Sequence, residues 1–175
     1  MANPDHFQQL RSGRWAAWRS TNPTIAPDLI DADLSGLDLR GLDLAKAHLR
    51  GANLSNARLD GANLSHASLE ASVLGGASFR DAILDNTHLD FLDLSGLDMS
   101  GASLQGTSFR GANLTRTSLR RANLTRAGLE GVLLESDAPV DVEWDFAAGS
   151  VQVVAAAPSR LAFAADGTRA LLDGQ

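Results

Sequence analysis

The sequence predicts an all-β solenoid, and three observations support this. A large apolar residue returns at every fifth position from Leu34 to Leu134 without an insertion. A small or apolar residue stands two positions before each of these, and glycine is frequent two positions after. A period of five fits neither the helical nor the strand template. Self-similarity at a fixed short period is typical of a solenoid, in which no unit can bury its apolar side chains alone.

Residues 1–30 are expected to form a capping helix and a lead-in to the repeats. Pro4 and Asp5 favour a helix start, and Asn22-Pro23 favours its end. One broad face of this helix would carry Phe7, Leu10, Trp15 and Trp18, which we expect to pack on the first coil. Such a cap is needed because the end of a solenoid exposes unpaired backbone and an apolar cross-section.

Residues 31–136 contain the repeats, and each unit is expected to be a short extended face that ends in a corner. Glycine at the corner position suits a backbone with positive φ, and Asn56 and Asn86 suit the same role. The apolar residue at the centre of each unit should point inward. The predicted core includes Leu34, Leu54, Leu74, Phe79, Leu94, Met99, Phe109 and Leu114.

The repeats resemble those of the pentapeptide repeat family, whose consensus is A-(D/N)-L-x-x. The consensus is spelled out by Ala52-Asn53-Leu54, by Ala62-Asn63-Leu64 and by Ala112-Asn113-Leu114. The resemblance implies a right-handed quadrilateral β-helix with four units per coil, so residues twenty apart should stack. The uniform leucine column from Leu34 to Leu134 in steps of twenty supports this stacking independently. The repeats would then form roughly five coils, a rod about 25 Å long at the usual inter-strand spacing.

The stretch from Arg14 to Pro23 resembles the Trp-x-x-Trp-Arg...Asn-Pro leader that often precedes bacterial pentapeptide repeats. Residues 137–175 differ in kind, because Val- and Ala-rich stretches with a period of two alternate with turn signals such as Asp166-Gly167. They predict a small β-meander or a β-rich tail. Two parts of this segment, residues 142–149 and 160–169, are together weakly similar to one blade of a WD-repeat propeller. Three interpretations stay open: a cap on the last coil, a mobile tail, or part of a larger propeller architecture.

The sequence does not predict an enzyme. Cysteine and tyrosine are absent, and neither a phosphate-binding loop nor a clustered metal signature is present. We therefore expect no catalytic residues, no cofactor and no metal site. Four histidines are interpreted as solvated, and two of them, His48 and His88, would lie about 10 Å apart by strand spacing. The absence of a signal peptide and of a long apolar run favours a cytoplasmic bacterial protein without a membrane contact.

Charged residues of the repeats are distributed unevenly along the rod. Twelve acids and ten bases lie between Ala32 and Ser136, a net charge of −2. A candidate acidic contact region comprises Asp81, Asp85, Asp90, Asp93 and Asp98, and a candidate basic region comprises Arg110, Arg116, Arg120, Arg121 and Arg126. A further column, with Arg50, Glu70, Asp90, Arg110 and Glu130, is expected to form a ladder of exposed ion pairs of small energy.

Three apolar residues at outward positions, Val73, Ile83 and Phe91, are candidate partner contacts. The predicted function is a non-catalytic interaction or scaffold module that binds an unknown protein. The family resemblance implies an alternative, which is DNA mimicry: an acidic rod that binds DNA gyrase or topoisomerase IV and gives drug or toxin resistance. A third possibility is a structural spacer. We expect a monomer or an end-to-end homodimer, and the net charge of −6 argues against direct nucleic-acid binding.

Overall fold

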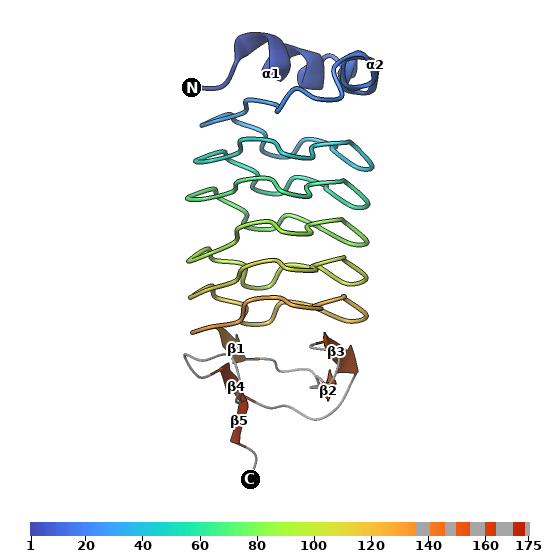
Figure 1. Cartoon of the computed structure of the whole chain (residues 1–175). Coiled ribbons are helices and arrows are strands. Elements are labelled where there is room, and N and C mark those ends of the chain that lie inside the picture. Colours follow the sequence, from blue (N-terminus) through green and yellow to red (C-terminus); the bar gives the residue numbers. More distant parts are fainter. Residues whose placement is uncertain (136–140, 146–149, 155–159, 164–169, 174–175) are drawn as a thin grey trace.

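The computed structural model describes residues 1–135, 141–145, 150–154, 160–163 and 170–173, and the main body of the molecule is a stack of coils (Figure 1). Parallel β-bridges join residues twenty positions apart, such as Asp33 with Asn53 and Asp43 with Asn63. One coil therefore holds four five-residue units. Because each unit contributes only one bridged residue, the coils are joined by isolated bridges and not by extended strands.

The four faces of the rod are named here by the residues that fill its interior. Face 1 contains Leu34, Leu54, Leu74, Leu94 and Leu114; face 2 contains Leu39, Leu59, Phe79, Met99 and Leu119; face 3 contains Leu44, Leu64, Leu84, Leu104 and Leu124; face 4 contains Leu29, Leu49, Leu69, Leu89, Phe109 and Leu129. All of these side chains are buried, and they form one continuous apolar core with the alanines two positions before them.

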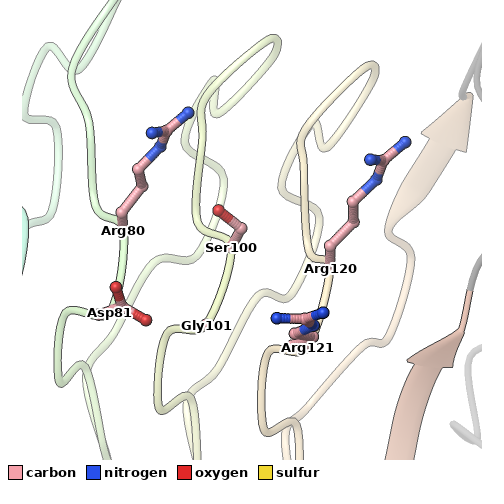
Figure 2. A pocket seen from close by; sticks show the side chains of 6 residues that line it. All are labelled: Arg80, Asp81, Ser100, Gly101, Arg120 and Arg121. Carbon is pink, nitrogen blue, oxygen red and sulfur yellow. The ribbon is translucent and has the colours of Figure 1, made fainter.

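Each face ends in a corner whose second residue after the central side chain has positive φ. Glycine fills many of these positions, for example Gly36 at φ 65°, but Lys46 adopts φ 61° at the same place. The corner geometry is therefore set by the stack and not by glycine alone. Side chains twenty apart form columns on the outside, as Figure 2 shows for Arg80, Ser100 and Arg120 on face 2 and for Asp81, Gly101 and Arg121 at the following corner.

Buried hydroxyl groups replace alanine at a few interior positions, and most of them are satisfied. The Thr107 Oγ1 donates to the carbonyl of Leu84 at 2.7 Å, and Thr87 and Thr117 make the same bond to the coil before them. Ser72 is the exception among the described residues, since its buried Oγ has no hydrogen-bond partner. An unsatisfied buried hydroxyl is destabilising, whereas a satisfied one is not.

We expect Ser72→Ala to raise the free energy of unfolding by about 1 kcal/mol, because the variant removes an unpaired buried hydroxyl. Thr107→Val should lower it by about 1 kcal/mol, because it removes a hydroxyl that is hydrogen-bonded. Urea unfolding followed by circular dichroism measures both. Destabilisation by both substitutions would show that the Ser72 hydroxyl is satisfied in solution.

The N-terminal segment forms two helices, α1 (Pro4–Arg11) and α2 (Trp15–Thr21), and not the single helix expected from the sequence. Gly13 adopts φ 71° between them, which a continuing helix cannot accommodate. The Asn3 side chain caps α1 by accepting from the backbone of Asp5 at 2.9 Å. Trp15 and Leu10 are buried, while Phe7 and Trp18 are partly buried against the same core.

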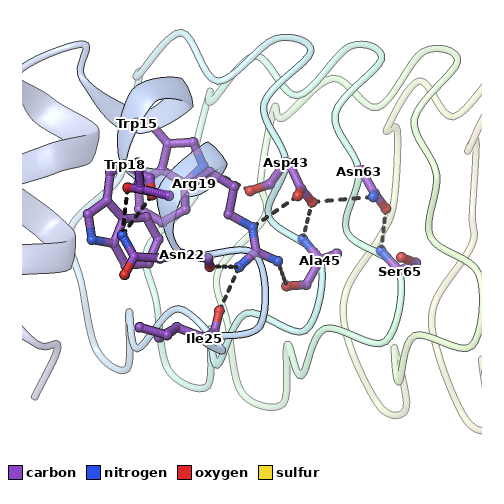
Figure 3. Close-up of polar contacts among 10 residues, drawn as sticks. Trp15, Trp18, Arg19, Asn22, Ile25, Asp43, Ala45, Asn63 and Ser65 are labelled. Carbon is purple, nitrogen blue, oxygen red and sulfur yellow. Dashed lines mark hydrogen bonds and ion pairs between the residues drawn. The ribbon is translucent and has the colours of Figure 1, made fainter.

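Arg19 joins α2 to the first coil (Figure 3). Its guanidinium is buried, and Nε donates to Asp43 Oδ2 at 2.9 Å. The remaining nitrogens donate to backbone carbonyls of Asn22, Ile25 and Ala45 at 2.6 to 3.2 Å. The indole of Trp15 also donates to the Asp43 carbonyl at 2.8 Å. Side chain and backbone of one aspartate thus hold the helices on the rod.

Five short strands follow the coils: β1 (Leu133–Glu135), β2 (Asp141–Asp145), β3 (Ser150–Val154), β4 (Arg160–Phe163) and β5 (Ala170–Asp173). Their antiparallel pairs form two sheets, with strand orders β1-β4-β5 and β2-β3. A simple meander would pair β3 with β4, so this arrangement differs from the expected one. Most of the stretch compared with a propeller blade, including the Asp166-Gly167 turn, lies outside the described residues.

Candidate functional site

The backbone ladder that joins the coils is interrupted at one place. On face 1, Leu54 N–H donates to the Val73 carbonyl at 2.8 Å, and Val73 N–H donates to the Ala52 carbonyl at 3.0 Å. Between the next two coils, both described throughout, the equivalent bonds are missing on face 1 and at the corners before and after it. The N–H groups without their ladder bonds, each followed by the carbonyl it would reach, are Leu74 to Asp93, Asp93 to Ser72, Gly76 to Ser95, and Ala71 to Asp90.

We call this gap between segments 71–76 and 90–95 the open seam. On face 4, directly before it, the bridge Ser68 with His88 still joins the two coils. Side-chain size accounts for the opening. Leu92 occupies an interior position where most units have alanine, and it stacks on Ser72 of the preceding coil.

Phe91 lies at the corner that borders the open seam, and it is unusual in two respects. Its side chain is 73% exposed, and its backbone has φ 59°. A bulky residue with positive φ is strained by about 1 kcal/mol or more, and an exposed aromatic ring gains little from burial. The ring lies over Gly111, whose Cβ, if present, would be 2.7 Å from it.

Val73 lies on the opposite edge of the seam from Phe91 and is 54% exposed. The unsatisfied Ser72 hydroxyl is directly beside it in the chain. Ile83 is 40% exposed but belongs to face 3, so it does not lie on this edge. Two of the three apolar residues singled out from the sequence therefore border the seam beside unpaired backbone groups, although the ring of Phe91 lies over Gly111, on the coil farther from Val73.

The five candidate acidic residues lie on all four faces and not on one. Asp93 is on face 1, Asp98 on face 2, Asp85 on face 3 and Asp90 on face 4, while Asp81 is at the corner after face 2. Most of them accept hydrogen bonds from the next coil. Asp85 accepts from the Ser103 hydroxyl and the Gln105 backbone, Asp90 from the Ser108 hydroxyl and the Arg110 backbone, and Asp93 from the Asn113 side chain.

Hydrogen bonds lower the pKa of two of these carboxyl groups, Asp93 and Asp98. Those from the Ser95 side chain and backbone hold the pKa of Asp93 below its usual value. Burial raises the pKa of Asp98, but bonds from Ser100 and Arg80 outweigh this effect and lower it overall. Much of the acidic character of this region is therefore already engaged within the rod.

The pKa of the Asp38 carboxyl group is strongly lowered. The Arg40 side chain donates to it at 2.7 and 2.6 Å and lowers its pKa to about 2. Since the folded pKa is depressed, any stabilisation from this pair is complete above about pH 4 and is lost as the pH falls toward 2. We expect the carboxyl ¹³C signal of Asp38 to remain that of a carboxylate at pH 3. An ordinary midpoint near pH 4 would show that the Arg40 contact does not persist in solution.

The predicted ion-pair ladder on face 4 is largely wrong. Within residues 1–135, the pair Arg110 with Glu130 forms at 4.0 Å, while Arg50 and Glu70 do not pair and Asp90 is bound by Ser108 instead. The five candidate basic residues are exposed and surround the rod: Arg110 on face 4, Arg120 on face 2, and Arg116, Arg121 and Arg126 at three successive corners.

His48, His66 and His88 are exposed, whereas His6 is not simply solvated as expected. Its Nδ1 accepts from the Asp28 backbone at 3.0 Å, and its ring lies 4.7 Å from that of Trp18. Among the described residues, no group of three or more His, Asp or Glu side chains could hold a metal ion. Neither helix of the described part is long and apolar enough to cross a membrane.

The coils define this protein as a β-solenoid with four five-residue units per turn. The chain belongs to the pentapeptide repeat family: a family model described as pentapeptide repeats, in eight copies, matches residues 28–65, 62–101 and 98–135. Proteins of this family form right-handed quadrilateral β-helices, and the predicted solenoid is confirmed at this level. A search of curated proteins finds no match.

Several solved structures are similar. Rfr23, a pentapeptide repeat protein from the cyanobacterium Cyanothece 51142, is 30% identical over 53% of this chain and 60% of its own, with a TM-score of 0.43. A trypsin-treated variant of QnrB1, a plasmid-mediated fluoroquinolone resistance protein, is 19% identical over 58% of this chain and 52% of its own, with a TM-score of 0.50. The pentapeptide repeat protein alr5209 from Nostoc Pcc 7120 is 28% identical over 59% of this chain and 81% of its own, with a TM-score of 0.36.

The chain thus spans 60% and 52% of the length of the first two of these proteins. The similarity to QnrB1 is a similarity of fold.

Proposed function

We propose that this protein is a non-catalytic binding module whose partner protein contacts the open seam between Phe91 and Val73. Phe91 carries the proposal, because it combines an exposed ring with a strained backbone at a position where glycine or asparagine would cost less. The neighbouring N–H groups of Leu74, Gly76 and Asp93 lack their ladder partners, so a bound segment could accept from them. Apolar contact and backbone pairing would then act together.

Phe91→Asn tests this proposal. Asparagine tolerates positive φ, so we expect the variant to be as stable as the parent or more stable by about 1 kcal/mol. Affinity capture from cells that express the protein, with chemical cross-linking, should retain a partner on the parent and lose it on the variant. Light scattering on the same samples shows whether that partner is a second copy of the chain.

Ile83→Asn is the matched control, because Ile83 is an exposed apolar residue on face 3, away from the seam. It should leave capture and association unchanged. If Phe91→Asn retains the same proteins and the same oligomeric state, the seam is not the contact.

Binding to a type II topoisomerase is the second candidate. The acidic residues between Asp81 and Asp98 and the fold shared with QnrB1 support it. The arrangement of these acids around four faces, and their hydrogen bonds within the rod, weigh against mimicry of a DNA strand pair by one face. A DNA duplex as long as the rod would carry on the order of fifteen negative charges. The repeats between Ala32 and Ser136 have a net charge of only −2.

A gyrase supercoiling assay, with and without a quinolone, separates the two candidates. Protection or inhibition at low micromolar protein that disappears in a triple variant with Asp81, Asp85 and Asp90 changed to asparagine would establish topoisomerase binding. Absence of any effect of the parent protein on supercoiling would exclude gyrase and leave the seam-binding module.

A further inference from the structure

A recess of about 420 Å³ lies on face 2 and the corner after it, lined by Arg80, Asp81, Ser100, Gly101, Arg120 and Arg121. Its shape follows from the columns. Figure 2 shows long side chains on the first and third of three successive coils, with Ser100 and Gly101 between them. Two coil spacings separate the flanking side chains, which is roughly 9.6 Å.

The charge of the recess is positive. Arg80 pairs with Asp98, but Arg120 and Arg121 form no ion pair or side-chain hydrogen bond with any residue that the structure describes. No acid occurs in the sequence between Met99 and Gly128. Asp81 is the acidic residue of the lining, and its carboxylate leans over Gly101. Two exposed guanidinium groups thus border a space that short side chains keep open.

We propose that this recess binds a phosphate monoester, either a free small molecule or a phosphorylated side chain. Guanidinium groups bind phosphate oxygens through paired, charge-assisted hydrogen bonds, and a phosphate monoester carries nearly two negative charges at neutral pH. Arg120 and Arg121 supply two positive charges from the third of these coils, and Arg80 lines the recess on the first.

The ligand is a single phosphate and not a nucleic acid. Asp85, Asp90, Asp93 and Asp98 surround the adjoining coils, and the protein has a net charge of −6, so a long polyanion would be repelled outside the recess. The recess does not depend on the open seam, which lies on face 1 and at the corners beside it. An experiment that refutes binding at the seam therefore does not refute phosphate binding at the recess, and the reverse also holds.

Titration of isotope-labelled protein with O-phosphoserine, at constant ionic strength, tests the proposal. We expect saturable shifts of the Nε–Hε signals of Arg120 and Arg121. The double variant with Arg120→Gln and Arg121→Gln should weaken binding at least tenfold. Asp81→Asn should strengthen it severalfold, because the variant removes the negative charge of the lining.

Two further variants distinguish a shaped site from general attraction of anions. Arg126→Gln removes an equally exposed arginine of the same coil at another corner, and it should change the affinity less than twofold. Ser100→Gln fills the recess without changing its charge, and it should weaken binding at least fivefold. Equal weakening by Arg126→Gln, or unchanged binding in Ser100→Gln, would overturn the proposal.

A peptide with one central phosphoserine identifies the source of the phosphate. Binding at least tenfold tighter than free O-phosphoserine would assign the site to a phosphorylated protein segment. Equal affinities would assign it to a free phosphate compound. Equal affinity for the unphosphorylated peptide with glutamate in place of phosphoserine would refute a phosphate site.

Discussion

Asp43→Ala should release the N-terminal helices and lower the free energy of unfolding by about 3 kcal/mol. The substitution leaves the Arg19 guanidinium buried without its charge partner, because the other contacts of Arg19 are neutral carbonyls. It also removes the acceptor for Asn63, which links the first two coils (Figure 3). Chemical unfolding measures the loss, and fluorescence of Trp15 and Trp18 reports release of the helices.

Asp33→Ala is the matched control. Asp33 occupies the same position of its unit on face 1 and accepts from Ser35 and Asn53, and Arg11 of α1 acts on it only through its charge, without a direct ion pair among the described residues. This variant should lower the free energy of unfolding much less than Asp43→Ala does. If the two variants are equally destabilised, Asp43 acts through its turn and not through Arg19.

Phe109→Ala should destabilise the protein by about 3 to 5 kcal/mol, because it leaves a cavity in the interior of face 4. Phe109 is fully buried, and the coils on both sides hold its neighbours in place. Phe91→Ala removes an identical ring that is 73% exposed, so the free energy of unfolding should change little. The pair therefore separates the role of a core ring from that of a surface ring in one experiment.

Thermal and urea unfolding of both variants provides the measurement. Comparable losses from the two substitutions would mean that Phe91 packs as a core residue through its contact with Gly111. That result would also remove the basis for a partner contact at the open seam.

The repeat region could be predicted from the sequence because every unit obeys the same rule. The period of five places each central residue inside, and the twenty-residue stacking follows from four units per coil. Val73 and Phe91 could be singled out because apolar residues are rare at outward positions. The same stacking rule places them on adjacent coils.

Other features depend on comparisons between coils that a periodic pattern conceals. The open seam arises from the size of Leu92 relative to alanine, in combination with Ser72 in the preceding coil. The contact of Arg19 with Asp43 joins positions 24 residues apart that belong to different elements. Gly13 marks the break between the two helices, but a single glycine does not distinguish a break from a tolerated residue within a helix.

The twenty-residue stacking has a consequence for how such a chain can lengthen or shorten. An insertion of five residues would keep every central side chain inside, so the core would accept it. Each downstream unit, however, would move to the next face, and columns such as Arg80, Ser100 and Arg120 would be split around a corner. Only steps of a whole coil conserve both interior and exterior. Gene duplications in this fold can therefore preserve stability while scrambling recognition, and selection for binding should favour lengths that change by twenty.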